Sequence, residues 1–239
     1  MRPSINKLVR IFAGTIPAEE PIYEFGSFQV PGQEAIADLR PYFPDKRYVG
    51  TDMREGKGVD RVLDLHDLDV ESGAVGTAIM IDTLEHVEYP HRAVAEVHRV
   101  LCDRGILLMT SVMRFPIHEH PYDYWRFTPE AFLSLLKGFE FSWADFAGEP
   151  DFPHTVVGIG AKAEIEPAAF GRFRERYEAW KEWARAETWP EWLTPHPQGV
   201  PPHPDDVPPP RPPTTREKIR DALPDPIVRT IRQIKPRRW

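Results

Sequence analysis

The sequence has little cysteine and no long hydrophobic run, and each shortage excludes a class of protein. Cys102 is the one cysteine among 239 residues, which excludes an intrachain disulfide framework and a zinc site of four thiolates. No stretch of 18 apolar residues occurs, so no membrane-spanning helix is predicted. The Gly-x4-Gly-Lys-Ser/Thr pattern of nucleoside triphosphate enzymes is absent too. A single thiol suits a protein of the reducing cytoplasm.

Proline is in excess, and its position divides the chain. Ten of the 27 prolines lie in residues 195–213, which predicts an extended linker. The net charge is +4 after residue 194 and −11 before it, within a total of −7. An acidic body argues against nucleic-acid binding, which usually needs a basic face. The predicted parts are an α/β domain with an N-terminal helix (1–165), an aromatic helix (166–194), the linker (195–213) and a basic tail (214–239).

Strand and helix patterns alternate through the body. Apolar runs predict five strands, at residues 21–25, 47–51, 61–63, 77–81 and 105–110. Helical spacing occurs at 33–42, at 91–101 and after Thr128, and an amphipathic N-terminal helix places Ile5, Leu8, Val9 and Phe12 on one side. Residues 139–146 and 155–163 form two more strand patterns with no helix between them. This order predicts a doubly wound, Rossmann-like sheet of seven strands with a terminal antiparallel strand.

Acidic residues and a glycine stand where the first four strands end. Glu24 and Gly26 end the first strand, and Asp52, Asp64 and Asp82 end the next three. In open α/β sheets these ends line the ligand crevice, so the ordered set is typical of a nucleoside site. Each residue alone is explained equally well as a turn former.

Four stretches of the body carry a further pattern: YEFGS (23–27), YVGTDMREGKGVDRVLDLHDL (48–68), IDTLEHVEYPHRAVAEVHRVLCDRGILLMTS (81–111) and HPYDYWRFTPEAF (120–132). With these stretches the sequence resembles class I S-adenosylmethionine-dependent methyltransferases of the bacterial small-molecule type. The resemblance implies S-adenosyl-L-methionine as cofactor. It implies cofactor-binding roles for Glu24, Gly26, Ser27, Asp52, Met53, Asp64, Leu65 and Asp82. Within this set Asp52 would bind the ribose, Asp64 and Leu65 the adenine, and Asp82 the methionine portion.

The cofactor loop departs from the family pattern of alternating glycines. After Gly26, the positions of the later glycines hold Phe28 and Val30. A Cβ restricts backbone conformations that glycine permits, so we expect the loop to take another path, returning through Gly32.

Residues 113–127 are rich in side chains suited to an acceptor site. His118 and His120 are candidate general bases, as is His86 after the fourth strand. Stacking on an acceptor is predicted for Tyr122, Tyr124 and Trp125, and pairing with its phosphate or carboxylate for Arg126. The alternatives are that Tyr124, Trp125 and Phe127 pack in the core beneath the last two strands and that Arg126 pairs with a local acid. His118 and His120 also suggest a metal site, but the sequence supplies no third ligand, so we predict none.

The C-terminal segments suggest where the protein works. Phe170, Phe173, Tyr177, Trp180 and Ala184 form a helical stripe, which predicts packing on the body or an aromatic surface for a homodimer or partner. The tail combines isoleucines with eight basic residues and Trp239, a composition suited to peripheral contact with an anionic membrane. We therefore expect methyl transfer to a small-molecule or glycan-type acceptor, in the cytoplasm or at a membrane surface. The alternative is a non-catalytic scaffold of the same fold.

Overall fold

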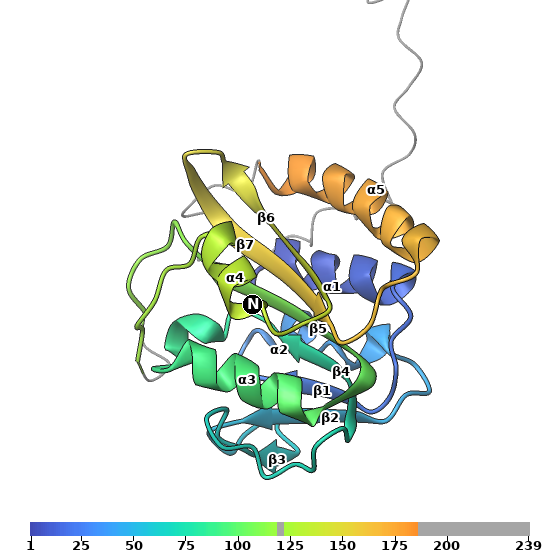
Figure 1. The fold of residues 1–239 in the computed structure, drawn as a ribbon. Helices are drawn as coiled ribbons and strands as arrows, with labels where there is room; N and C mark the ends of the chain where they lie inside the picture. The colour runs from blue at the N-terminus through green and yellow to red at the C-terminus, as the bar shows by residue number, and fades with distance from the viewer. Residues whose placement is uncertain (119–121, 186–239) are drawn as a thin grey trace, which may run out of the picture. The chain divides into compact units, whose positions relative to one another are not determined.

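The computed structural model describes residues 1–118 and 122–185, and its centre is one seven-stranded sheet (Figure 1). The strand order is β3-β2-β1-β4-β5-β7-β6. The strands are β1 (Ile22–Phe25), β2 (Tyr48–Asp52), β3 (Arg61–Val62), β4 (Val75–Met80), β5 (Leu101–Val112), β6 (Phe141–Glu149) and β7 (Phe152–Ala161). The first five strands are parallel, and β7 runs antiparallel to both β5 and β6. The predicted fold class is confirmed.

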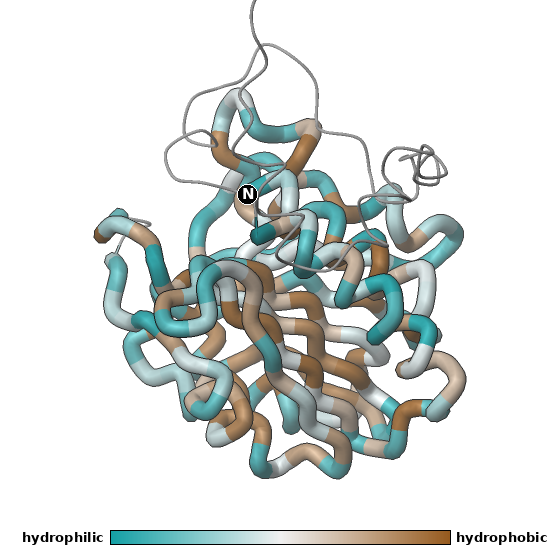
Figure 2. Tube along the Cα trace, turned by 90° about the horizontal axis from the view of Figure 1, so that it is seen from above, coloured by the Kyte–Doolittle hydropathy of each residue, from teal (hydrophilic) through white to brown (hydrophobic). Residues whose placement is uncertain are grey.

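Helices cover both faces of the sheet, and two apolar clusters fill the space between. The helices α1 (Pro3–Thr15) and α5 (Pro167–Ala184) pack on one face, together with the 3-10 turn η1 (Arg40–Tyr42). The other face is covered by α3 (Pro90–Val100) and α4 (Pro129–Leu135). Figure 2 shows the hydrophobic strands inside and the hydrophilic residues toward the outside. Because both faces are covered, β4 is buried along its whole length.

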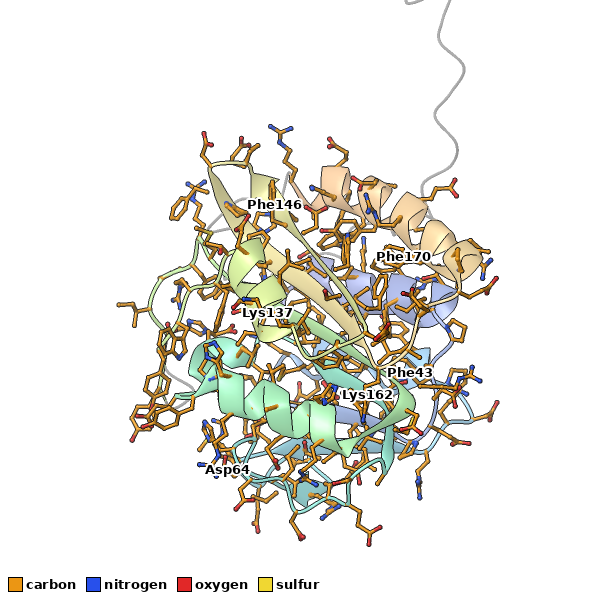
Figure 3. The ribbon with its side chains drawn as sticks, in the orientation of Figure 1. Phe43, Asp64, Lys137, Phe146, Lys162 and Phe170 are labelled. Atoms are coloured by element: carbon orange, nitrogen blue, oxygen red, sulfur yellow. The ribbon has the colours of Figure 1, made fainter. Side chains whose placement is uncertain are left out.

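The predicted amphipathic helices pack as their patterns require. Ile5, Leu8, Val9 and Phe12 of α1 are fully buried, as predicted. In α5, four members of the predicted stripe are fully buried, and the Phe170 ring lies 4.9 Å from that of Phe141 (Figure 3). The stripe therefore packs on the body, which was the first of its two predicted roles. At α4, Thr128 is the N-cap and accepts a hydrogen bond from the Ala131 N–H at 3.2 Å.

One predicted helix is wrong in extent. Residues 33–42 form a single turn, α2 (Glu34–Ala37), followed by the separate turn η1, rather than one continuous helix. Pro41 explains the break, because a continuous helix would need an N–H at Pro41 to bond to the Ala37 carbonyl, and the proline ring would clash with that carbonyl. The chain between β1 and β2 is therefore mostly irregular.

The linker and the basic tail, residues 195–239, lie outside the described residues, as do 186–194 of the aromatic segment. Within the part that the structure describes, no helix has the length and apolarity needed to span a membrane.

Candidate active site

Two acids lie at one side of the carboxyl edge, where β2 and β3 end; we call Asp52 and Asp64 the β2–β3 edge. Asp52 Oδ1 accepts from the backbone N–H of Arg54 at 3.0 Å and from its Nε at 3.2 Å. Asp64 Oδ1 lies 2.8 Å from both the backbone nitrogen and Nδ1 of His66. The Asp64 side chain is 68% exposed and lies at the margin of the molecule (Figure 3). Each acid thus satisfies one oxygen with a residue two positions away, and Met53 beside them is exposed.

Glu24 lies in the interior at the end of β1. It is fully buried and accepts a hydrogen bond from the Tyr48 hydroxyl at 2.7 Å. Burial raises the pKa of Glu24 to about 7, and the hydrogen bond from Tyr48 opposes that rise only in part. Glu24 is therefore held in the interior by Tyr48, with its carboxylate shielded from solvent.

Gly26 makes the sharp turn after β1. Its φ of +88° is readily adopted only by glycine, and a Cβ there would overlap Thr83 Oγ1. Thr83 follows β4, and its hydroxyl donates to the Phe25 carbonyl at 3.1 Å. The first glycine of the loop is therefore needed for both conformation and close packing.

The rest of the loop is occupied by side chains where the family pattern has glycine. The Ser27 hydroxyl lies 3.2 Å from the Thr51 carbonyl and 3.0 Å from that of Gly58. The Arg54 guanidinium lies 4.4 Å from the centre of the Phe28 ring, which also covers Gly56. The loop returns through Gly32, whose φ is +85°, as expected. Phe28 thus joins the loop after β1 to the loop after β2.

The other side of the carboxyl edge is a buried polar group; we call Arg2, Asp82, Glu85, Thr110 and Ser111 the β4–β5 edge. Asp82 Oδ1 accepts from the Thr110 hydroxyl at 2.7 Å, and Arg2 Nη2 lies 3.2 Å from Asp82 Oδ2. Although burial opposes it, the Arg2 charge holds the pKa of Asp82 below its usual value. Asp82 has a φ of +43°, a conformation rarely adopted by residues with a side chain. The Arg2 guanidinium and the Thr110 hydroxyl therefore hold the Asp82 side chain, and with it the unusual backbone of Asp82, in place.

Glu85 lies in the turn η2 (Leu84–His86) and is fully buried. Its Oε2 accepts from the Ser111 hydroxyl at 2.7 Å, and its backbone carbonyl accepts from the N–H groups of Tyr124 and Trp125. Burial, followed by the Asp82 charge, raises the pKa of Glu85 to about 8. Glu85 therefore connects the end of β4 to the segment that follows β5.

Two of the three candidate bases are brought together. The rings of His86 and His118 are 4.7 Å apart, centre to centre, in an edge-to-face arrangement. Nδ1 of His86 lies 2.5 Å from the Tyr122 carbonyl oxygen, and Nδ1 of His118 lies 3.1 Å from Asp123 Oδ2. His120 lies outside the described residues.

The predicted stacking residues are exposed rather than packed in the core. Tyr122, Tyr124 and Trp125 are 61%, 41% and 44% exposed. Tyr124 and Trp125 line an open pocket of about 740 Å³ together with Glu88, Tyr89, Pro90, His91 and Arg92. The Trp125 indole donates to the Val87 carbonyl at 3.0 Å, which orients the ring. This arrangement suits binding of a flat or ring-shaped molecule at the surface.

Arg126 is held by its own loop. Its guanidinium donates to both carboxylate oxygens of Asp123, at 2.5 and 2.8 Å, and to the Pro116 carbonyl at 2.9 Å. Asp123 is only 2% exposed, and although burial opposes it, the hydrogen bonds from Arg126 and from the His118 N–H lower its pKa to about 2. The alternative of a local ion pair is thus the one observed, and Arg126 fixes the loop.

Comparisons with known proteins agree with this fold. A family model described as a methyltransferase domain matches residues 37–109, and no curated protein matches the chain. A SAM-dependent methyltransferase from Archaeoglobus fulgidus is similar in structure, with 10% identity, a TM-score of 0.52, and 66% of this chain and 92% of that chain covered. A chain of the Haloferax volcanii complex that contains the Trm112 methyltransferase activator is also similar. Its identity is 14% and its TM-score is 0.51, with 68% of this chain and 91% of that chain covered. The CurJ carbon methyltransferase is similar at 16% identity and a TM-score of 0.50, with 67% of this chain and 54% of that chain covered.

The chain carries a class I methyltransferase domain. The structural likenesses show the fold, and the family match identifies the enzyme class, so the prediction of an S-adenosylmethionine-dependent methyltransferase is confirmed. The match begins at residue 37, after the methyltransferase's altered glycine loop.

Sequence reasoning missed three functional candidates of the methyltransferase: Arg2, Glu85 and Asp123. Arg2 precedes α1 and reaches Asp82 and Thr155 across the fold. Nothing in the sequence pairs residues that far apart. Glu85 had a usable signal, because it stands beside His86 immediately after an apolar strand. Asp123 could have been found from Arg126, which lies three residues later.

Proposed function

We propose that this methyltransferase transfers the methyl group of S-adenosylmethionine to a small-molecule or glycan-type acceptor. The open pocket lined by Tyr124 and Trp125 carries the acceptor part of the proposal, because exposed, oriented aromatic rings suit a planar molecule or the apolar face of a sugar. A macromolecular acceptor would be expected to need a broader complementary surface than this pocket.

The residues at the carboxyl edge fit the cofactor. Asp52 and Asp64 each use Oδ1 to bind a neighbour two residues on, so the second oxygen of each carboxylate, Oδ2, can accept from a ligand. This suits Asp52 to the ribose hydroxyls and Asp64 to the adenine amine. At the other side, Arg2 and Asp82 are an adjacent cation and anion, which suits the zwitterionic amino-acid portion. Arg2 Nε supports this placement, because it is buried and has no hydrogen-bond partner among the described residues.

For the methyl transfer itself, the protein must align the acceptor with the cofactor and exclude water from the site. Bound S-adenosylmethionine supplies an activated methyl group, so the protein must hold the acceptor atom in line with it. An acceptor hydroxyl also needs a base, and we assign this role to His86 or His118, with His120 as the third candidate. Glu85 is a poorer base near neutral pH because its raised pKa keeps it largely protonated.

Calorimetry of the full chain tests the cofactor. Titration with S-adenosylmethionine and with its demethylated product should show saturable binding at one site. Absence of heat with both at millimolar concentration would overturn the proposal in favour of the non-catalytic scaffold, which the altered loop at Phe28 and Val30 favours.

Steady-state kinetics tests the acceptor pocket once a turnover assay, the release of demethylated cofactor, has identified an accepted compound. Tyr124→Ala should raise the KM for the acceptor about tenfold, the effect of losing one stacked ring. Phe152→Ala is the matched control, because Phe152 is 51% exposed but does not line the pocket. Equal effects of the two variants would place the acceptor elsewhere.

We also propose a membrane-peripheral location, on sequence grounds alone, from the basic tail 214–239. The full chain should float with vesicles that contain phosphatidylserine and should be released by high salt. Equal flotation with purely neutral vesicles would contradict an electrostatic tether.

A further inference from the structure

Three metal-ligating side chains meet where β4 and β5 end. Glu85 and His86 come from η2, and His118 comes from the segment after β5. One ligand atom from each residue lies within 4.8 Å of the others. We call these three residues the Glu–His–His cluster. It lies next to the Asp82 carboxylate, whose charge adds to burial in raising the pKa of Glu85.

Glu85 presents a buried oxygen with no partner. Its Oε2 is bonded to Ser111, but Oε1 has no hydrogen-bond partner among the residues that the structure describes. A buried polar atom without a partner is costly, and such atoms are few in native proteins. A cation bound at Oε1 would remove that cost, and a ring nitrogen of each histidine lies within 4.8 Å of a Glu85 carboxylate oxygen.

Both histidines are oriented through Nδ1 by oxygen atoms. The Nδ1 of His86 faces the carbonyl of Tyr122 at 2.5 Å, and the Nδ1 of His118 faces the carbonyl of Pro116 at 3.2 Å and Asp123 at 3.1 Å. Carbonyl and carboxylate oxygens only accept, so these contacts favour, in the neutral ring, the tautomer with the proton on Nδ1, in which Nε2 is the ligating nitrogen. Metal-binding histidines typically donate their second N–H to such oxygens.

The acceptor for His118 is itself held in place. Asp123 is 2% exposed, receives two hydrogen bonds from Arg126 and accepts from the backbone N–H of His118 at 2.9 Å. This arrangement fixes both the position and the charge of the carboxylate behind the ring. It also gives Arg126 a function, which is to orient a ligand through Asp123.

We propose that Glu85, His86 and His118 bind one divalent cation of the zinc type, with His86 and His118 ligating through Nε2. Two imidazole nitrogens and one carboxylate oxygen suit Zn²⁺, Co²⁺ or Fe²⁺, whereas Mg²⁺ and Ca²⁺ prefer oxygen ligands alone. Three protein ligands leave a coordination position for water or for an acceptor oxygen. With the cation bound, coordination would lower the pKa of an acceptor hydroxyl and so replace an imidazole base.

Metal binding by the full chain tests this proposal without any assay of methyl transfer. The protein is purified on a tag that lacks histidine, stripped with a chelator, and titrated with Zn²⁺ by calorimetry and with Co²⁺ by visible absorption. We expect one tight equivalent of Zn²⁺ that excess Mg²⁺ does not displace. Displacement by Mg²⁺ at equal concentration, or no Co²⁺ absorption band, would overturn the proposal.

Substitutions locate the site among the nine histidines of the chain. His118→Ala and Glu85→Gln should weaken Zn²⁺ binding at least about tenfold; Gln keeps an oxygen for Ser111, so the second variant should remain folded. Asp123→Asn should weaken binding by about tenfold as well, the usual cost of losing a partner behind a ligand. His98→Gln on α3 is the control and should leave affinity unchanged. If Glu85→Gln, folded by circular dichroism, binds Zn²⁺ as tightly as the unaltered chain, the cluster is not the site.

Discussion

The two sides of the carboxyl edge are built in different ways. On the β2–β3 edge, each acid bonds to a residue two positions along the chain, and Asp64 is largely exposed. On the β4–β5 edge, Arg2 bonds to Asp82, 80 residues away, and to Thr155, 153 residues away. Arg2 and Asp82 are only 4% and 19% exposed. The contacts of the β2–β3 edge are local, and its Asp64 is open to solvent although Asp52 is only 9% exposed. The β4–β5 edge is assembled from distant segments and is buried.

This difference separates binding from stability. An exposed acid with a local partner contributes little to folding, so it can be devoted to a ligand. A buried charge with a distant partner must keep that partner, because an uncompensated charge in the interior is very costly. Substitutions on the β2–β3 edge should therefore change affinity with little loss of stability, whereas those on the β4–β5 edge should lower stability as well as affinity.

The largest effect is expected from breaking the buried ion pair. Asp82→Asn leaves the Arg2 guanidinium buried without an opposite charge, which should lower the free energy of unfolding by about 4 kcal/mol. Combining it with Arg2→Met should restore much of that loss, because neither charge then remains. Urea unfolding of the two variants and of Asp64→Asn, which should change by no more than about 0.5 kcal/mol, checks this. Equal losses for Asp82→Asn and Asp64→Asn would abolish the comparison.

The same contrast explains what the sequence could predict. Asp52 and Asp64 were correctly placed at strand ends, because apolar runs followed by an acid are local patterns. The sheet and the faces of α1 and α5 were predictable for the same reason, since the buried stripes repeat at helical spacing. The Arg2–Asp82 pair and the Glu–His–His cluster depend on where β4, β5 and the N-terminus meet, which no local pattern specifies. The helix expected at 33–42 failed because Pro41 outweighed an apolar spacing of only a few residues.

A smaller effect, dependent on pH, is expected at Glu24. Its pKa is about 7 in the folded chain, from an ordinary value of 4.5, so the folded state keeps a proton that the unfolded state releases. The free energy of unfolding should therefore fall as pH rises from about 4.5 to about 7, by up to about 3 kcal/mol. Glu24→Gln should remove that part of the fall, because Gln does not titrate. The variant should remain folded, because Gln can still accept the hydrogen bond from Tyr48.

Urea unfolding across this pH range gives the measurement. Glu85 has a raised pKa too, and Tyr48, Arg40, Asp38 and Asp60 act on Glu24, so the decisive quantity is the difference between the two chains at each pH. Parallel curves would mean that Glu24 is ionised when buried.

Gly26 and Gly32 form a matched pair for testing how tightly the loop after β1 packs against Thr83, which follows β4. Both have a positive φ, so alanine at either should cost about 1 kcal/mol of backbone strain. At Gly26 the new Cβ would also overlap Thr83, whereas nothing lies within 4 Å at Gly32. Gly26→Ala should therefore cost about 1–2 kcal/mol more than Gly32→Ala. Equal melting temperatures would show that Thr83 moves aside freely.

Asp52 and Asp64 sharpen the comparison within the β2–β3 edge, where both acids have local partners and changes in affinity should occur with little loss of stability. Asp52→Ala removes the proposed acceptor of two ribose hydroxyls, and hydrogen bonds to a charged group contribute about 1.5–3 kcal/mol each, so binding of the demethylated cofactor should weaken at least tenfold. Asp64→Ala should weaken it only several-fold, because a carboxylate that is 68% exposed makes a hydrogen bond in competition with water. Calorimetry gives both affinities, and urea unfolding should show each variant within about 1 kcal/mol of the unaltered chain. If Asp64→Ala were the weaker binder, the adenine end would be the main determinant of affinity and the ribose would lie away from Asp52.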